Sequence, residues 1–196
     1  MDNDLEVTTQ LEKLSKVRTI IFDTKEPVSL FEACISRYKY LQVLNFEESS
    51  FEVLPSSIGT LKLLRFLNLS GKYKIKRLPN SICKLHSLQT LLLANCKNLE
   101  LLPKDIRNMI SLRFLMVTTN HTCMAENGES CFNSLRFLVI GACGCLKCLF
   151  GGMDRRLAYL RTLIVGKCPN LTSLSLSIKN LTALEFLGIG NCEELR

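Results

Sequence analysis

The 196-residue sequence lacks the motifs that mark the common nucleotide-binding and hydrolytic enzymes. It contains no Gly-x-x-x-x-Gly-Lys-Ser/Thr, the loop that cradles phosphates, and no Gly-x-Ser-x-Gly, the turn that presents a catalytic serine. It has only two histidines, His86 and His121, and neither belongs to a recognisable metal-binding or nucleophilic arrangement. We therefore expect neither an enzyme nor a cofactor.

Long runs of like charge are also missing. Lys and Arg number 25 against 18 Asp and Glu, which gives a net charge of +7. The densest basic stretch, residues 72–77, is interrupted by Tyr73 and Ile75. Because a nucleic-acid-binding or membrane-binding arm carries five or six consecutive like charges, none is predicted. Residues 137–153 carry one charge but are too short for a membrane helix, which needs roughly 20 apolar residues, so we expect them to be core.

A secretory signal is not apparent either. Residues 1–10 are polar and acidic, whereas a signal begins basic and then turns apolar. This favours a cytoplasmic location, in which the ten cysteines would be reduced thiols rather than a disulfide framework. A hydrophobic share of 47% excludes a disordered chain, and the length fits a single domain.

The sequence is dominated by a repeat, Leu-x-x-Leu-x-Leu. Seven copies begin at positions 41, 64, 88, 112, 135, 160 and 184, and a weaker copy begins at position 17. Successive starts lie 23–25 residues apart, a period typical of leucine-rich repeats. The pattern predicts an α/β leucine-rich repeat solenoid of about eight repeats, a curved horseshoe with parallel strands on its concave face and short helices or loops on its convex face. We assign residues 14–196 to it and residues 1–13 to a short lead-in.

Within one repeat, alternation along the strand predicts which side chains are buried. Leu64, Leu67 and Leu69 are expected to point inward, whereas Phe66 and Asn68 face out on the concave side. A Leu-Pro-x-x-Ile segment then returns along the convex side. Because proline fixes φ and lacks a backbone donor, it suits the turn into a short helix.

The ninth position of each repeat is where leucine-rich repeats prefer Asn or Cys, whose side chains can bond to the turning backbone. Lys25 and Lys72 depart from this preference, and Ser49 could serve. The other residues that we expect in this internal ladder are Cys96, Asn120, Cys143, Cys168 and Cys192.

One cysteine cluster has the spacing of a metal site: Cys143-x-Cys145-x-x-Cys148. Zinc needs four thiolate or imidazole ligands, and the ladder already accounts for Cys143. A fourth ligand from Cys123 or Cys168 has no support in the sequence. We therefore predict packed or surface thiols rather than a metal site, and keep a thiol-metal or redox protein as an alternative.

Two surfaces are candidates for binding a partner. One is the concave column, which is either an interaction surface or plain strand packing. The other is a row of arginines at the second position of the repeats, the basic ridge, which either docks an acidic protein surface or is a solvated edge. The concave residues are Val43, Asn45, Phe66, Asn68, Phe114, Met116, Phe137, Val139, Ile164 and Phe186. The ridge residues are Arg18, Arg65, Arg113, Arg136 and Arg161.

Five segments, residues 40–46, 51–59, 76–85, 96–106 and 168–174, carry a family resemblance. Through them the chain resembles the leucine-rich repeat region of plant coiled-coil nucleotide-binding leucine-rich repeat (NB-LRR) disease resistance proteins, of the resistance gene analogue type. The resemblance is to the intracellular Leu-Pro-x-x-Ile repeats. It implies a non-enzymatic domain of plant innate immunity that binds proteins: pathogen effectors, guarded host proteins or a neighbouring nucleotide-binding domain.

The sequence departs from the full NB-LRR architecture. It has no coiled-coil domain and no nucleotide-site motif, so nucleotide binding is not implied. We also expect a solenoid truncated at its C-terminal end, because no terminal cap is evident. A free-standing signalling scaffold, similar to the intracellular Ras-associated leucine-rich repeat proteins, is the alternative function.

Overall fold

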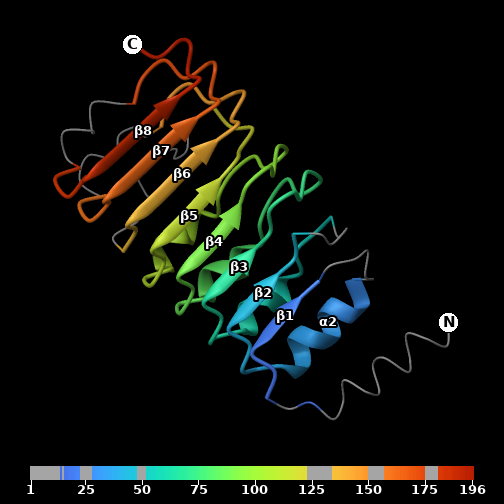
Figure 1. Cartoon of the computed structure of the whole chain (residues 1–196). Coiled ribbons are helices and arrows are strands. Elements are labelled where there is room, and N and C mark those ends of the chain that lie inside the picture. Colours follow the sequence, from blue (N-terminus) through green and yellow to red (C-terminus); the bar gives the residue numbers. More distant parts are fainter. Residues whose placement is uncertain are drawn as a thin grey trace.

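The computed structural model describes residues 14, 16–22, 28–47, 52–122, 134–149, 157–174 and 181–196. Its eight strands form one parallel sheet in chain order, so each strand is hydrogen-bonded to the next strand in the sequence (Figure 1). This arrangement confirms the predicted leucine-rich repeat solenoid. The proposed lead-in, residues 1–13, lies outside the described residues. The strands are β1 Thr19–Ile21, β2 Val43–Asn45, β3 Phe66–Asn68, β4 Thr90–Leu93, β5 Phe114–Val117, β6 Phe137–Gly141, β7 Thr162–Gly166 and β8 Phe186–Gly190.

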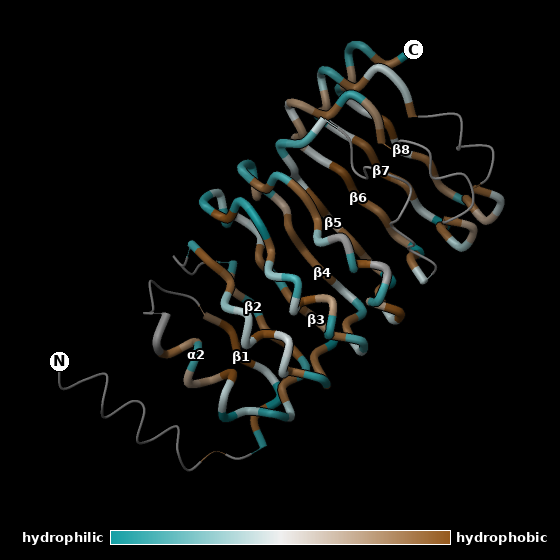
Figure 2. Tube along the Cα trace, turned by 180° about the vertical axis from the view of Figure 1, so that it is seen from behind, coloured by the Kyte–Doolittle hydropathy of each residue, from teal (hydrophilic) through white to brown (hydrophobic). Residues whose placement is uncertain are grey.

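The strands pair in the register of the repeat. Leu67 of β3 lies opposite Leu44 of β2 and Leu91 of β4, so residues of equal repeat position stack along the sheet. Each residue type that recurs in the sequence therefore becomes a row on the surface or in the core. Figure 2 shows apolar residues concentrated along the strands.

Short helices carry the chain back along the other side. The 3-10 helices η1 (Ser56–Thr60), η2 (Asn80–Lys84) and η3 (Lys104–Asn108) follow the prolines of the three Leu-Pro segments directly. The first repeat differs, because a ten-residue α-helix, α2 (Val28–Arg37), occupies its return. Prolines therefore start the 3-10 helices as predicted, and the first repeat, which has no Leu-Pro, uses an α-helix instead.

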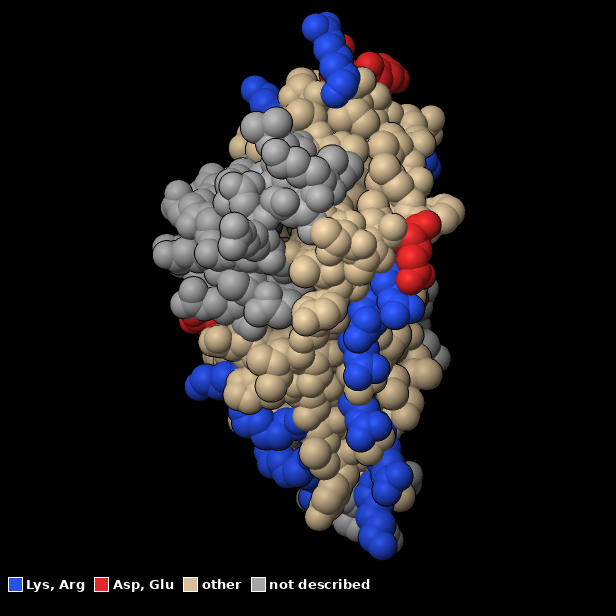
Figure 3. Space-filling model, turned by 90° about the vertical axis from the view of Figure 1, so that its left-hand side faces the viewer, with Lys and Arg blue, Asp and Glu red and all other residues tan. Residues whose placement is uncertain are grey.

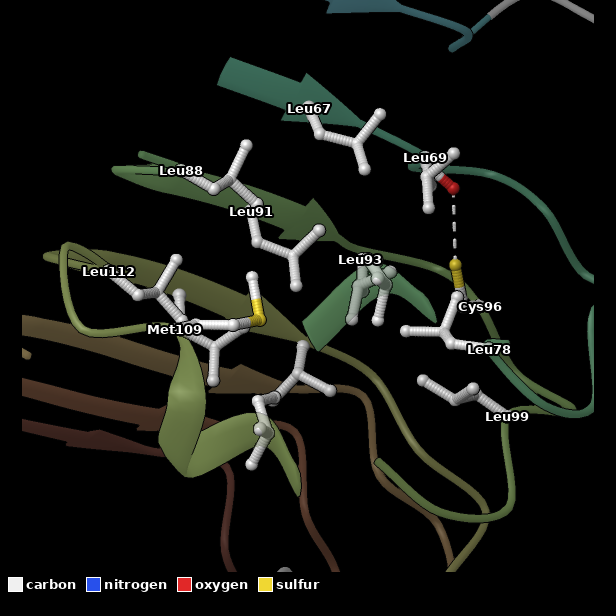
Figure 4. Close-up of a cluster of buried hydrophobic side chains, with 14 of the residues drawn as sticks. Leu67, Leu69, Leu78, Leu88, Leu91, Leu93, Cys96, Leu99, Met109 and Leu112 are labelled. Carbon is white, nitrogen blue, oxygen red and sulfur yellow. Dashed lines mark hydrogen bonds between the residues drawn. The ribbon is translucent and has the colours of Figure 1, made fainter. Parts of the chain in front are cut away.

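The inward side chains form one continuous core between the sheet and these helices. Leu64, Leu67 and Leu69 are fully buried, as predicted, and the equivalent leucines of the next two repeats stack beside them (Figure 4). At the N-terminal end, three aromatic rings complete the core. Phe22 stacks on Phe46 with ring centroids 4.9 Å apart, and Phe31 of α2 meets Phe46 edge-on at 4.5 Å.

The chain turns at the eighth position of the repeat, one to three residues after the strand ends. Gly71, Asn95, Ala142, Lys167 and Asn191 occupy this position, and all five have φ between 54° and 77°. Glycine and asparagine tolerate this left-handed conformation well, and the turn directs the next side chain inward. The ninth-position ladder follows from this geometry.

The ladder itself is confirmed for the cysteines. Cys96 is buried and donates from Sγ to the Leu69 carbonyl at 3.2 Å (Figure 4). Cys143 and Cys168 are also buried, each donating to the carbonyl of the residue two before it, and Cys192 repeats this bond in the last repeat.

At two other ladder positions the structure differs from the prediction. Asn120 is exposed, and the buried Thr119 takes its place by donating from Oγ1 to the Leu99 carbonyl at 2.7 Å. Lys72 does fill its position: the side chain is buried and Nζ donates to the Glu47 carbonyl at 2.9 Å. A long cation can therefore bond the preceding turn as a small side chain does. Lys25 and Ser49 lie outside the described residues.

Candidate protein-binding surfaces

The basic ridge is built by the backbone. In every repeat after the first, the second-position N–H donates to the second-position carbonyl of the preceding repeat. This series runs unbroken from Arg18 to Glu185 with N···O distances of 2.7–2.9 Å. Its members are therefore held one strand spacing apart, about 4.8 Å. The five ridge arginines lie in this one row, with Gln42 and Gln89 between them.

The ridge guanidiniums are available to a partner. Arg136 is half-buried and the other four are exposed. Within the described part of the chain, only Arg161 has a side-chain partner, Glu185, at 3.5 Å. Figure 3 shows Lys and Arg side chains aligned along one edge of the molecule. Four like charges without local carboxylates add to a positive potential that would favour an acidic surface.

The concave face loses its asparagines toward the C-terminal end. The fifth positions of β2 and β3 are Asn45 and Asn68, whereas from β4 to β8 the fifth positions hold apolar residues or glycine. Three of the predicted contact residues are exposed: Phe137 at 41%, Ile164 at 37% and Phe186 at 55%. Phe114 and Phe137 stack with ring centroids 6.0 Å apart. Six more of the predicted contact residues are half-buried: Val43, Asn45, Phe66, Phe114, Met116 and Val139.

Asn68 was predicted to face out on this surface, but in the structure its side chain is buried. Only 4% of it is exposed, because it bonds within a polar network across two repeats. Its Nδ2 donates to Glu47 Oε2 at 3.1 Å, and its Oδ1 accepts from the Ser70 N–H at 2.9 Å. The concave face at β3 is therefore internally satisfied. Exposed apolar side chains lie on β6, β7 and β8, and at the other end of the sheet Ile21 of β1 is 63% exposed.

Sequence reasoning missed two contributors to this apolar region. Leu92 is a half-buried fifth-position residue of β4, and its place in the repeat was a sufficient signal. Gly188 is the fifth-position residue of β8, where an added Cβ would lie 3.1 Å from the Phe186 ring. The absent side chain lets that ring lie across β8, a contact that repeat position alone does not predict.

The structure does not gather the cysteine candidates into one site. Cys143 is buried in the ladder, Cys145 is exposed and donates to Asn120 Oδ1 at 2.9 Å, and Cys148 is half-buried. Across the described ranges, no group of three or more His, Cys, Asp or Glu side chains is placed to hold a metal ion. The hydrogen bond with Cys168, together with burial, raises the pKa of the Cys143 thiol, which favours a protonated ladder residue. Cys123 lies outside the described residues.

A family model described as "Leucine-rich repeat region" matches residues 16–138, more than half of the chain. The chain belongs to the leucine-rich repeat family. No curated protein matches the sequence significantly.

Solved structures agree with this leucine-rich repeat fold. A plant peptide hormone receptor, RGFR1 in complex with RGF2, is 23% identical with a TM-score of 0.67, over 95% of this chain and 32% of the receptor. The Leptospira interrogans protein LIC12759 is 25% identical with a TM-score of 0.60, over 95% of this chain and 50% of that one. The leucine-rich repeat domain of the type III effector XCV3220 (XopL) is 21% identical with a TM-score of 0.62, over 97% and 74%. This chain therefore spans a third to a half of the length of the first two.

The leucine-rich repeat surfaces suit binding rather than catalysis. Repeat solenoids present extended surfaces for protein partners, and members of this family are generally non-enzymatic interaction scaffolds. Over the described part of the chain, no helix is long and apolar enough to cross a membrane. The geometry offers a row of cations along the start of the strands and, next to it, an apolar face of the same sheet.

Proposed function

We propose that this chain is a cytoplasmic protein-binding domain of plant innate immunity, from the NB-LRR class of disease resistance proteins. In this role it recognises a pathogen effector or a guarded host protein, or restrains a nucleotide-binding domain. The Leu-Pro segments that lead into η1, η2 and η3 support the proposal, because they are the feature by which the sequence resembles the intracellular plant repeats.

The basic ridge is the observation that carries the proposal. Arg18, Arg65, Arg113 and Arg136 have no side-chain hydrogen bond or ion pair to any described residue. A stabilising structural role would require such partners, since exposed charges alone contribute little to folding. Aligned like charges instead cost some self-repulsion, which a complementary acidic surface relieves.

The apolar residues of β6–β8 provide the second part of the binding surface. Charged rows steer and orient an approaching partner, whereas buried aromatic contacts supply most of the affinity of an interface. Phe137, Ile164 and Phe186 are exposed on β6, β7 and β8, and Arg136 and Arg161 directly precede β6 and β7. A partner would be oriented by the ridge and held by the apolar side chains.

Co-precipitation tests the proposal directly. The chain is mixed with the nucleotide-binding domain of a related resistance protein, supplied as a separate polypeptide, at low and high salt. We expect binding that weakens as salt rises, because exposed charge pairs are screened. Absence of binding by a soluble, monomeric chain would contradict docking to a nucleotide-binding domain and favour the free-standing scaffold.

A further inference from the structure

Exposed apolar side chains form a strip beside the basic ridge. Tyr40, Leu63 and Tyr159 each directly precede the first leucine of a repeat, and Ile110 lies two residues before the first leucine of its repeat. All four are between 43% and 67% exposed. Since the ridge arginines directly follow the first leucine, this apolar strip and the ridge run in parallel where the strands begin. Figure 3 shows uncharged side chains alongside the aligned Lys and Arg side chains.

The turn that leads into each strand holds the apolar strip outward. The Lys62 N–H donates to the Thr60 carbonyl at 2.9 Å, and the Leu64 N–H donates to the Leu61 carbonyl at 3.0 Å. Leu61 and Leu64 are buried, so Leu63 projects from the corner between these two anchors. The same pair of bonds recurs in the turns before β2 and β5. Apolar side chains aligned at hydrogen-bonded turns form an ordered surface that suits a partner.

Cations border the strip on its other side as well. Lys39 and Lys62 are exposed in the turns that precede β2 and β3. Their ammonium groups donate to the backbone carbonyls of Ile35 and Lys84, at 3.2 and 3.3 Å. A molecule that covers the strip therefore meets positive charge on both sides, and charge complementarity requires it to be acidic.

The spacing of the ridge arginines matches the pitch of an α-helix. Gln89 separates Arg65 from Arg113, and Arg136 belongs to the next repeat. At about 4.8 Å per strand, Arg113 and Arg136 lie about 10 and 14 Å from Arg65 along the row. A helix rises about 5.4 Å per turn, so carboxylates at positions i+7 and i+11 lie about 10.5 and 16.5 Å from one at position i. The difference of about 2 Å or less is within the reach of a flexible arginine side chain.

A helix also presents two rows of side chains to one surface. Residues at i+1 and i+8 are turned about 100° from the carboxylates and form a second stripe beside them. They lie about 10.5 Å apart, and Leu63 and Ile110 are two strand spacings apart, about 10 Å. In an extended segment the neighbouring row points to the opposite face. The two parallel rows on this chain therefore favour a helix over an extended peptide.

We propose that the ridge and the apolar strip together bind an acidic amphipathic helix of a partner protein, which lies along the solenoid where the strands begin. Its carboxylates pair with Arg65, Arg113 and Arg136, and its apolar stripe covers Leu63 and Ile110. This inference rests on the proposed function, because it uses the same ridge, and it names the shape and chemistry of the partner segment.

A synthetic peptide tests the proposal. The probe is an alanine-based helical peptide of about 18 residues, long enough to form a helix, with Glu at i, i+7 and i+11 and Leu at i+1, i+8 and i+12. The control is an isomer in which the same residues are spread around the helix. We expect the full chain to bind the probe at least about tenfold more tightly than the isomer in calorimetric titration, because equal net charge leaves only the positions of the side chains.

Two variants and their matched controls locate the bound peptide. Arg113→Glu should weaken binding of the probe at least about tenfold, since an attraction becomes a repulsion. Ile110→Ser should weaken it several-fold through the lost apolar contact. Lys97→Glu and Val53→Ser change exposed residues that lie away from the strand starts, so both should bind as the wild type does. Circular dichroism checks that every variant is folded.

The proposal is overturned if the probe binds no better than its isomer, or if either Arg113→Glu or Ile110→Ser leaves its binding unchanged. These outcomes are distinct from failure of the proposed function. If the separate nucleotide-binding domain binds but the probe and isomer are equal, the acidic helix is wrong and the docking role stands. If the probe binds as expected but that domain does not, the helix-binding surface stands and its partner is a different protein.

Discussion

Leu67 shows how one residue fixes the strand register. Its side chain, at the fourth position of the repeat, is fully buried in β3 between Leu44 and Leu91 of the neighbouring strands. We expect Leu67→Ala to lower the free energy of unfolding by roughly 2–5 kcal/mol, because it leaves a cavity in a packed core.

Leu63 offers the matched control for this substitution. It is 43% exposed and lies only four residues earlier, so Leu63→Ala should cost less than about 1 kcal/mol. Urea denaturation of both variants measures the difference. A loss below about 1 kcal/mol for Leu67→Ala would show that the strand register is wrong.

The buried thiols predict how stability depends on pH. Burial raises the pKa of Cys83 to about 11 and that of Cys96 to about 11. An unfolded chain loses these protons near pH 8.5, whereas the native state keeps them. The stabilisation is therefore fully present below that pH and is lost as the pH rises toward 11, by roughly 1–3 kcal/mol for each thiol.

Urea unfolding at a series of alkaline pH values, under reducing conditions, measures this dependence. The double variant Cys83→Ala, Cys96→Ala should lose less stability between about pH 9 and 11 than the wild type does. Cys145→Ala removes an exposed thiol and is the control. Identical pH dependence in the wild type and the double variant would refute the effect.

At the scale of elements, the spacing between the convex helices depends on one glycine. Gly59 of η1 is buried, and a Cβ there would lie 2.5 Å from the Ser81 carbonyl oxygen of η2. Because backbone on both sides must move, we expect Gly59→Ala to lower the free energy of unfolding by about 1–3 kcal/mol.

Gly144 provides the comparison for this second substitution. A Cβ at Gly144 meets nothing within 4 Å, so Gly144→Ala should change the thermal midpoint little. Thermal unfolding of both variants distinguishes a steric effect from the general effect of replacing glycine. Equal midpoints for the two variants would argue against close packing of η1 on η2.

The elements themselves could be predicted because each repeat carries its own signals. Leu-x-x-Leu-x-Leu marked every strand, and Leu-Pro marked the start of each 3-10 helix. What could not be predicted depends on contacts between repeats. Asn68 is buried and donates a hydrogen bond to Glu47 of the preceding repeat, and Thr119 takes the ladder place of Asn120 by bonding to the Leu99 carbonyl. Position within one repeat contains no information about these neighbours.

On the scale of the whole molecule, repetition converts single residues into surfaces. The row of ridge arginines followed directly from the second position of the repeat, and the outward aromatic residues followed from the third. The repeat did not predict which of these side chains are paired or exposed. Arg161 is paired with Glu185, and among the predicted contact residues only those on the last three strands are exposed. Side-chain pairing and burial depend on the curvature and the ends of the solenoid, which the repeat unit does not encode.

The most direct test of the central claim is charge reversal on the ridge. The triple variant Arg65→Glu, Arg113→Glu, Arg136→Glu is compared with a control triple, Lys84→Glu, Lys97→Glu, Lys147→Glu, whose exposed lysines lie away from the ridge. Both triples lower the net charge from +7 to +1, since each of three reversals removes two charges.

The measurement is the affinity of each triple for the separate nucleotide-binding domain. We predict that the ridge variant binds at least about tenfold more weakly than the wild type, because three oriented charge contacts become repulsive. The control should bind within about threefold of the wild type. If both triples weakened binding equally, the cause would be the change in net charge and not the position of the ridge. Unchanged binding by the ridge variant would contradict docking through the ridge.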